Sequence, residues 1–198
     1  MKDNTIDRIS PEQALEILRG LASNNPAIKK QIENKAEEIL KEISVEEICE
    51  EVYSALDRID VEELWDRSGP SRYGYSAPED MAVEMMEEEL ALFNREVFKY
   101  LEMGMAKEAK LYSMGILKGI YQYEQESKSE FKDWAADVPA ECFGYLLLEW
   151  KKRASNENDL KEMGEFIEKK CGKWAKWALK AGPPNQSLQP IADKSDSG

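Results

Sequence analysis

Residues 111–123 read Leu-Tyr-Ser-Met-Gly-Ile-Leu-Lys-Gly-Ile-Tyr-Gln-Tyr, and Lys118 is their only charged residue. On a helix, the apolar side chains of this stretch point in several directions instead of forming one stripe. A helix that is apolar most of the way round is usually buried among other helices. We therefore expect residues 111–123 to form the central helix of a helical protein.

The flanking sequence has the spacing of amphipathic helices. Apolar residues recur every three or four positions, at Val45, Ile48, Val52, Leu56 and Ile59 and again at Ala82, Met86, Leu90, Phe93, Val97 and Leu101. Gly104 follows the second stripe and suits a left-handed helix end that turns the chain back. Sustained alternation with β-branched residues is absent from the sequence, so we expect no strands.

Helix starts are marked by capping residues before prolines or acidic residues. Signals of this kind occur at Ser10, Asn25, Ser44, Asp60 and Ser76. Residues 140–154 and 158–180 are predicted to form one further helical hairpin. The predicted fold is all-α, with antiparallel helical hairpins either stacked as a short array like tetratricopeptide (TPR) or HEAT repeats, or packed as an irregular helical bundle.

The predicted organisation is a single all-α domain over residues 1–182. Within it, residues 1–9 form a flexible N-terminus, and residues 66–77 form a structured loop between helices. Residues 183–198 are rich in Pro, Gln and Ser and lack an amphipathic pattern, so a disordered tail is expected there.

Composition excludes several kinds of chemistry. The formal charge is −13, and residues 1–143 carry all of the acidic excess, because residues 144–198 have a net charge of +2. Such a surface repels phosphate backbones, so nucleic acid is not an expected partner. The sequence has no histidine, which removes His-activated nucleophiles and His-ligated zinc. The cysteines, Cys49, Cys142 and Cys171, fall among apolar helical positions and are expected to be reduced core thiols without a metal or cofactor.

A cytoplasmic location is expected. The N-terminal residues lack the apolar run of a signal peptide, and no stretch has the length of a membrane span. Residues 169–180 are basic and contain Trp174 and Trp177, a pattern that also occurs in helices lying on anionic membranes. Because Met163, Ile167 and Cys171 continue one stripe with Trp174, core packing is the favoured interpretation.

The loop at residues 66–77 is chemically unlike the rest of the chain. It contains Gly69 and Gly74 together with arginines and tyrosines, a mixture typical of binding loops. The candidate binding residues are Trp65, Arg67, Arg72, Tyr73 and Tyr75. The alternative is structural: the arginines pair with the chain's own Asp57, Asp60 or Asp66 while the aromatic side chains plug the core.

A carboxylate pattern supplies a different hypothesis. Glu47 and Glu50 are three residues apart, as are Glu63 and Asp66 in the next predicted helix. Two such pairs hold Mg²⁺ in all-α nucleotide pyrophosphohydrolases of the MazG type, because residues one turn apart converge on one face and hard oxygen ligands suit the ion. With so many acidic residues in the chain, a solvated acidic face is the competing interpretation.

The stretch of residues 55–75, which includes Ala-Leu-Asp-Arg-Ile-Asp-Val-Glu-Glu-Leu-Trp-Asp-Arg-Ser-Gly, resembles a helical region of uncharacterised prokaryotic proteins that often stands beside a SWIM-type zinc finger. The resemblance extends through Tyr123 and implies a helical accessory or scaffold module. This chain has no Cys-x-Cys or Cys-x-His, so it cannot build the finger, and no functional residue is carried over. The predicted function is a non-enzymatic module that binds another protein, with the Mg²⁺-dependent pyrophosphohydrolase as the alternative.

Overall fold

The computed structural model describes residues 8–72, 74–154 and 156–180. The chain divides into two compact units, Met1–Ile43 and Ser44–Gly198. The first unit is a helical hairpin, and the second is a larger helical bundle. The predicted disordered tail at residues 183–198, and residues 1–7 of the predicted flexible N-terminus, lie outside the described residues.

The first unit consists of α1 (Pro11–Asn24) and α2 (Pro26–Leu40). Helix α1 begins with the predicted capping box, because the Ser10 hydroxyl accepts from the Gln13 backbone N–H at 3.3 Å and the Gln13 side chain accepts from the Ser10 N–H at 2.9 Å. The Asn25 side chain caps α2 by accepting from the N–H groups of Ala27 and Ile28. Each helix also starts with a proline, so both boundaries follow from local sequence.

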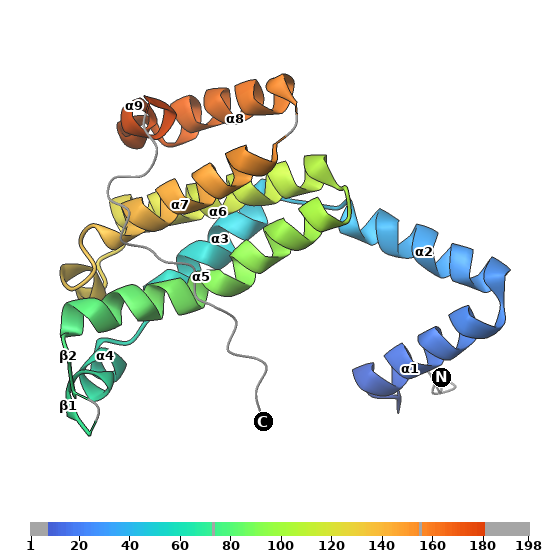
Figure 1. Ribbon diagram of the computed structural model, residues 1–198, viewed down its shortest axis with the longest axis horizontal. Coiled ribbons are helices and arrows are strands. Elements are labelled where there is room, and N and C mark those ends of the chain that lie inside the picture. Colours follow the sequence, from blue (N-terminus) through green and yellow to red (C-terminus); the bar gives the residue numbers. More distant parts are fainter. Residues whose placement is uncertain (1–7, 73, 155, 181–198) are drawn as a thin grey trace, which may run out of the picture. The chain divides into compact units, whose positions relative to one another are not determined.

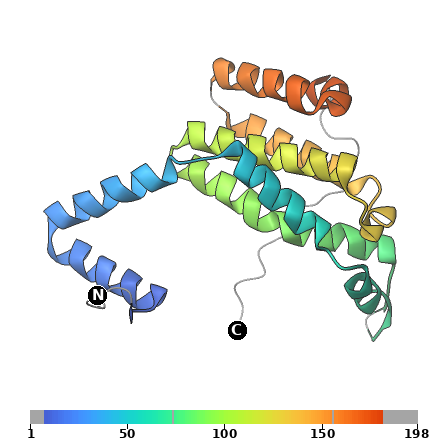
Figure 2. The same ribbon diagram turned by 180° about the vertical axis from the view of Figure 1, so that it is seen from behind.

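The second unit contains seven of the α-helices of the described chain and one small sheet (Figures 1 and 2). In chain order these elements are α3 (Val45–Asp57), α4 (Val61–Arg67), β1 (Gly69–Ser71), β2 (Gly74–Ser76), α5 (Pro78–Glu102), α6 (Ala106–Glu126), the 3₁₀ helix η2 (Glu130–Asp133), α7 (Val138–Arg153), α8 (Glu157–Lys170) and α9 (Gly172–Lys180).

Helix α6 is the centre of the second unit, as the apolar stretch at residues 111–123 predicts. It packs against α3, α5, α7 and α8, and Figures 1 and 2 show it among the first three of these. Ile116, Leu117, Ile120 and Tyr123 are almost completely buried. In a repeat array each pair of helices contacts only its neighbours, whereas here four helices share one central helix. The fold is therefore an all-α bundle.

Two glycines allow α3 to approach α6 closely. A Cβ atom on Gly115 would lie 2.6 Å from the Ile48 Cβ, and one on Gly119 would lie 2.7 Å from the Val52 Cβ and 2.8 Å from the Cys49 carbonyl oxygen. These distances are far below van der Waals contact, so only glycine fits at both positions.

Helix ends follow the sequence signals closely in α5 but not everywhere. Gly104 has φ +72°, and the bonds Gly104 N–H to Leu101 O and Met105 N–H to Tyr100 O make a Schellman motif that turns the chain into α6. Helix α5 begins after Ala77 without a side-chain cap, so the start expected at Ser76 is wrong by one residue. The predicted helix at 158–180 divides at Cys171 into α8 and α9.

The expectation of no strands is wrong for residues 69–76. Strands β1 and β2 pair antiparallel, with Gly69 opposite Ser76 and Pro70 opposite Tyr75. Each strand has only three residues, which is too short for alternation of apolar and polar side chains to be visible in the sequence. Gly69 and Gly74 adopt φ values of +100° and +135°, which other residues rarely reach. The predicted structured loop is thus a β-hairpin.

The C-terminal helices pack by their apolar side. Met163, Ile167, Cys171 and Ala178 are buried, whereas the lysines of α9 are exposed. Trp174 meets Tyr121 of α6 and Phe143 of α7 with ring centroids 5.3 and 5.2 Å apart. Among the helices described, none has the length and apolar composition to cross a bilayer.

Candidate interaction surface

Helix α4 buries one leucine against the rest of the bundle. The Asp60 side chain caps the helix by accepting from the Glu62 N–H at 2.8 Å, and Leu64 is completely buried. The Ser68 hydroxyl donates to the Leu64 carbonyl oxygen at 2.6 Å and closes the helix before the β-hairpin begins. A seven-residue helix is unstable alone, so α4 depends on its contacts with the rest of the bundle, of which Leu64 is the buried one.

Trp65 lies beside Leu64 and remains half exposed. Its ring packs edge-to-face on Trp134, which follows η2, with centroids 4.7 Å apart and planes at 78°. This geometry is favourable for two aromatic rings and restricts both side chains. Trp65 retains 49% of its accessible surface, so a rigid aromatic pair faces solvent. Sequence reasoning missed Trp134, because its contact with Trp65 joins positions nearly seventy residues apart and leaves no local signal.

Arg67 has a structural role. Its guanidinium pairs with Glu63 at 2.6 Å within α4 and with Glu88 of α5 at 2.7 Å. Hydrogen bonds to Glu88 and Glu63 raise the pKa of Arg67 above its usual value. The arginine therefore links α4 to α5. A pairing of the arginines with the chain's own carboxylates was the structural alternative for this loop, but the partners are Glu63 and Glu88 and not Asp57, Asp60 or Asp66.

Trp65 and Arg67 belong to opposite sides of α4. Two residues apart on a helix, they are separated by about 160° around its axis. Consistently, Trp65 contacts Trp134 beside η2, whereas Arg67 contacts α5. The structure does not bring these two predicted binding residues onto one surface.

The β-hairpin presents Tyr75 to solvent. Tyr75 is 71% exposed, and its cross-strand neighbour Pro70 is exposed as well. Side chains of directly opposite residues lie on the same face of a sheet, so these two form one apolar patch. Arg72, at the turn, is also exposed. Tyr73, the remaining predicted binding residue, lies outside the described residues.

Helix α4, which carries Trp65, and the β-hairpin lie at the same end of the bundle (Figures 1 and 2). Helix α4 contacts η2 and leads directly into β1. Exposed carboxylates flank the hairpin on both sides, at Glu62 and Asp66 before it and at Glu79 and Asp80 after it. We name Trp65, Pro70, Tyr75 and Trp134 the aromatic end of the bundle.

The four carboxylates of the Mg²⁺ hypothesis are distributed over different sites. Glu47 and Glu50 line an open hollow of about 560 Å³ between α3 and α5, together with Glu51, Arg58 and Phe93. Glu63 lines a separate hollow of about 170 Å³ and is engaged by Arg67. Asp66 lines neither hollow. Among the residues that the structure describes, no three acidic or cysteine side chains are arranged to hold a metal ion.

All three cysteines are free and buried, as the sequence predicts. Burial raises the pKa of the Cys142 and Cys171 thiols to about 12 and also raises that of Cys49. A thiol acts as a nucleophile or metal ligand only when deprotonated. At neutral pH these side chains are therefore packing groups.

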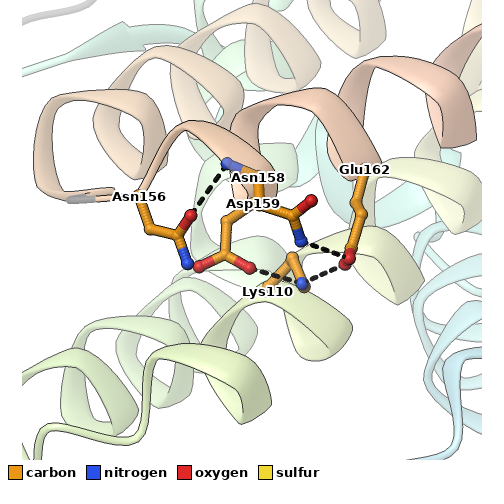
Figure 3. A network of polar contacts seen from close by, with 5 residues as sticks. All are labelled: Lys110, Asn156, Asn158, Asp159 and Glu162. Carbon is orange, nitrogen blue, oxygen red and sulfur yellow. Dashed lines mark hydrogen bonds and ion pairs between the residues drawn. The ribbon is translucent and has the colours of Figure 1, made fainter.

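A buried lysine links α6 to the start of α8 (Figure 3). Lys110 donates to Asp159 and Glu162, and its side chain is only 8% exposed. Asn158 supports the cluster by donating to Glu162 at 2.7 Å. Burial alone would lower the pKa of Lys110, but the hydrogen bonds to the two carboxylates raise it above its usual value. Lys110 therefore stays charged and serves as an anchor for α8.

Comparison with protein-family models, with curated proteins and with solved structures finds no match. The resemblance of residues 55–75 to helical regions beside SWIM-type zinc fingers stays a prediction. The function is therefore inferred from the side chains of this chain alone.

Proposed function

We propose that the protein is a non-enzymatic helical module that binds another protein through the aromatic end of its bundle. The observation that carries this proposal is the exposure of Tyr75, at 71%, on the β-hairpin, and of Trp65, at 49%, where its ring packs against Trp134. Exposed Trp and Tyr side chains on a fixed framework are typical of residues that dominate the energy of protein interfaces. Tyr75 and Trp65 lose little conformational entropy on binding, because each has only two rotatable side-chain bonds.

The surroundings of the aromatic end favour a partner with a basic surface. Glu62, Asp66, Glu79 and Asp80 are exposed around the β-hairpin, and the whole chain carries a formal charge of −13. Complementary charge accelerates association and rejects acidic competitors, nucleic acids among them. Binding should therefore weaken as salt concentration rises, because the flanking carboxylates are exposed to screening.

The chemistry of the rest of the chain supports a binding role over catalysis. The chain has no histidine, and its cysteines are buried thiols with raised pKa values. The two hollows lined by α3, α4 and α5 are lined mainly by charged residues, whereas sites for small molecules are usually apolar with few polar groups.

The proposal is tested by affinity purification from cells that make the protein, with four full-length baits: the unaltered chain, Tyr75→Ala, Trp65→Ala, and Leu92→Ala as a control. Leu92 is 64% exposed on α5, so its replacement removes exposed apolar surface elsewhere. We expect a basic protein that is retained by the unaltered bait and by Leu92→Ala, and lost at least tenfold from the other two.

Stability separates loss of binding from loss of fold. Tyr75→Ala should leave the melting temperature unchanged, and Trp65→Ala should cost about 2–4 kcal/mol, because it loses the contact with Trp134 and the half of the side chain that is buried. Retention of every partner by the Tyr75→Ala and Trp65→Ala baits would overturn the proposal. A collapse of the melting temperature would instead make these side chains part of the structural core.

A further inference from the structure

The β-hairpin of the second unit has two outer edges, and its register determines which backbone groups each edge exposes. The strands are paired as Gly69 with Ser76, Pro70 with Tyr75, and Ser71 with Gly74. In an antiparallel ladder, pairs that exchange two hydrogen bonds alternate with pairs that exchange none. Proline has no N–H to donate, so Pro70 and Tyr75 form a pair without hydrogen bonds. Their backbone groups therefore point away from each other, toward the outer edges of the hairpin.

The edge of β1 is protected against a further strand, whereas the edge of β2 is open. Pro70 presents a carbonyl oxygen but no N–H, and proline on an edge strand is one of the features by which proteins prevent strand pairing. Tyr75 presents both an N–H and a C=O at the outer edge of β2. Within the part of the chain that the structure describes, no group outside the hairpin bonds to either of them. An extended segment therefore finds two main-chain partners at this edge.

The open edge of β2 is accessible to another molecule. Tyr75 is 71% exposed, and Gly74 is exposed as well. The two strands pack chiefly on each other, and Figures 1 and 2 show the hairpin at the end of the bundle, beside α4. A sheet of only two strands is marginally stable in water, so a third strand adds pairing that the hairpin lacks.

We propose that the basic partner adds an extended segment beside β2 as the third strand of this sheet. The inference rests on the proposed function and specifies how the partner uses the aromatic end. Main-chain hydrogen bonds to Tyr75 align the segment, and its residue opposite Tyr75 lies on the same face as the rings of Tyr75 and Pro70. A β-branched or aromatic residue fits there best. Glu79 and Asp80 follow β2 and are exposed, so lysines or arginines elsewhere in the segment meet complementary charge.

Two other occupants fit the edge of β2 less well. A second copy of this chain would pair through its own β2, but each copy carries a formal charge of −13, so the two acidic bundles would repel each other. A helical segment bonds its backbone groups within itself and leaves those of Tyr75 unused. The edge therefore favours an extended segment with basic side chains.

The first test uses synthetic six-residue peptides with lysine at alternate positions and Val, Ile, Thr or Tyr between them, added to the full-length protein. We expect at least one of them to bind below millimolar concentration and to move the amide proton resonance of Tyr75 downfield, because this N–H gains a hydrogen bond. That peptide is then N-methylated on every second residue, in both possible registers. One version should bind at least tenfold more weakly, because its methyl groups face β2. The other version, whose methyl groups face outward, should still bind.

The second test alters the backbone of the protein and keeps its side chains. Replacing the peptide bond before Tyr75 with an ester removes the N–H of Tyr75, and we expect the peptide to bind about tenfold more weakly. The control is an ester before Glu157, the first residue of α8, because N–H groups at this position have no partner within a helix. The control ester should leave peptide binding unchanged. If the ester before Tyr75 lowers the melting temperature, the N-methylated peptides decide, since they leave the protein unaltered.

Several outcomes would overturn the third strand. Equal binding of both N-methylated versions, equal loss of both, or no binding by any peptide at millimolar concentration would each do so. Equal binding of peptides with glutamate in place of lysine would exclude a basic segment. A dimer of this chain that the ester before Tyr75 dissociates would assign the edge to a second copy. The proposed function fails separately: it is wrong only if Tyr75→Ala and Trp65→Ala retain every partner, whereas loss of the partner from these variants with full binding by the ester would exclude the third strand alone.

Discussion

Gly119 is a residue at which the core tolerates little change. Replacing it with alanine puts a Cβ atom 2.7 Å from the Val52 Cβ and 2.8 Å from a backbone carbonyl oxygen. The backbone of α3 must therefore move, and we expect Gly119→Ala to lower the free energy of unfolding by about 1–3 kcal/mol. Urea denaturation measures this change.

Gly164→Ala in α8 is the matched control for that substitution. Its added Cβ atom would meet only the end of Leu179, at an ordinary 3.8 Å, and alanine is the better helix former. The control should leave stability unchanged or raise it by up to about 1 kcal/mol. Equal effects of the two substitutions would contradict the close approach of α3 and α6.

The buried thiols predict a loss of stability in alkaline solution. Burial raises the pKa of Cys142 and Cys171 to about 12, from an ordinary value near 9. Between these values the folded state keeps protons that the unfolded chain releases, so stability falls as pH rises. Above about pH 9 each thiol should contribute a slope approaching about 1.4 kcal/mol per pH unit.

Urea denaturation from pH 7.5 to 10.5 measures that slope. The double variant Cys142→Ala, Cys171→Ala is less stable at every pH because it leaves cavities, so the slopes are compared and not the absolute values. The slope of the variant should be clearly shallower above pH 9. If the free energy of unfolding fell equally steeply with pH in the two proteins, these thiols would not be the cause of the loss of stability in alkaline solution.

The carboxylates of the Mg²⁺ hypothesis are predicted not to form a metal site. Glu63 is engaged by Arg67, and Asp66 lines neither hollow beside α3. Because ligands that bind only the native state raise its stability, millimolar Mg²⁺ or Mn²⁺ should leave the melting temperature unchanged within about 1 °C. A rise of several degrees that Asp66→Asn removes would revive the pyrophosphohydrolase alternative.

At the scale of elements, Lys110 is the buried ionic contact between α6 and α8. Its ammonium group is nearly buried between α6 and α8 and is paired there with Asp159 and Glu162. Removal of one partner from a buried ion pair leaves the remaining charge uncompensated. In Lys110→Ala we expect the amides of α8 and α9 to exchange with deuterium at least tenfold faster, while those of α3 and α6 stay protected.

The control for this exchange measurement is Lys152→Ala. Lys152 pairs with Glu149 at 2.6 Å within α7, but its side chain is 57% exposed. Exposed pairs of this kind contribute at most about 1 kcal/mol, so exchange should not change in α8. Uniformly faster exchange across the bundle in Lys110→Ala would show that the lysine stabilises the whole unit and not one element.

Helices were predictable where their signals are local. The capping residues Ser10, Asn25 and Ser44 and the left-handed Gly104 act within a few residues, so sequence gives these boundaries directly. The β-hairpin was not predictable, because strands of three residues are too short to show an alternation of apolar and polar side chains. The break at Cys171 lies directly before Gly172, and beyond it Trp174 packs on Tyr121 of α6 and Phe143 of α7, a contact that no local pattern encodes.

At the scale of the whole molecule, the sequence identified the unusual segment but not how its side chains are used. Arg67 forms an ion pair with Glu88 of α5. The ring of Trp134, which follows the 3₁₀ helix η2, packs against the ring of Trp65. Such contacts between remote positions are the part of a candidate site that one sequence does not reveal. Tyr75 is the predicted binding residue whose exposure agrees best with that role.

The chain thus combines two units of different charge, each with an exposed apolar surface. We infer that the bundle presents the aromatic end to a basic partner. The two surfaces differ in chemistry, since one is aliphatic and helical and the other is aromatic and lies beside a β-hairpin.

Site-specific photocrosslinking tests the central claim most directly. A photoreactive phenylalanine analogue is placed at position 75 of the full-length protein, in cells that make it, and at position 92 of a control. We predict one discrete crosslinked product of higher mass from position 75 that contains a basic protein, and none from position 92. No product from position 75, or the same products from both positions, would contradict binding through the aromatic end.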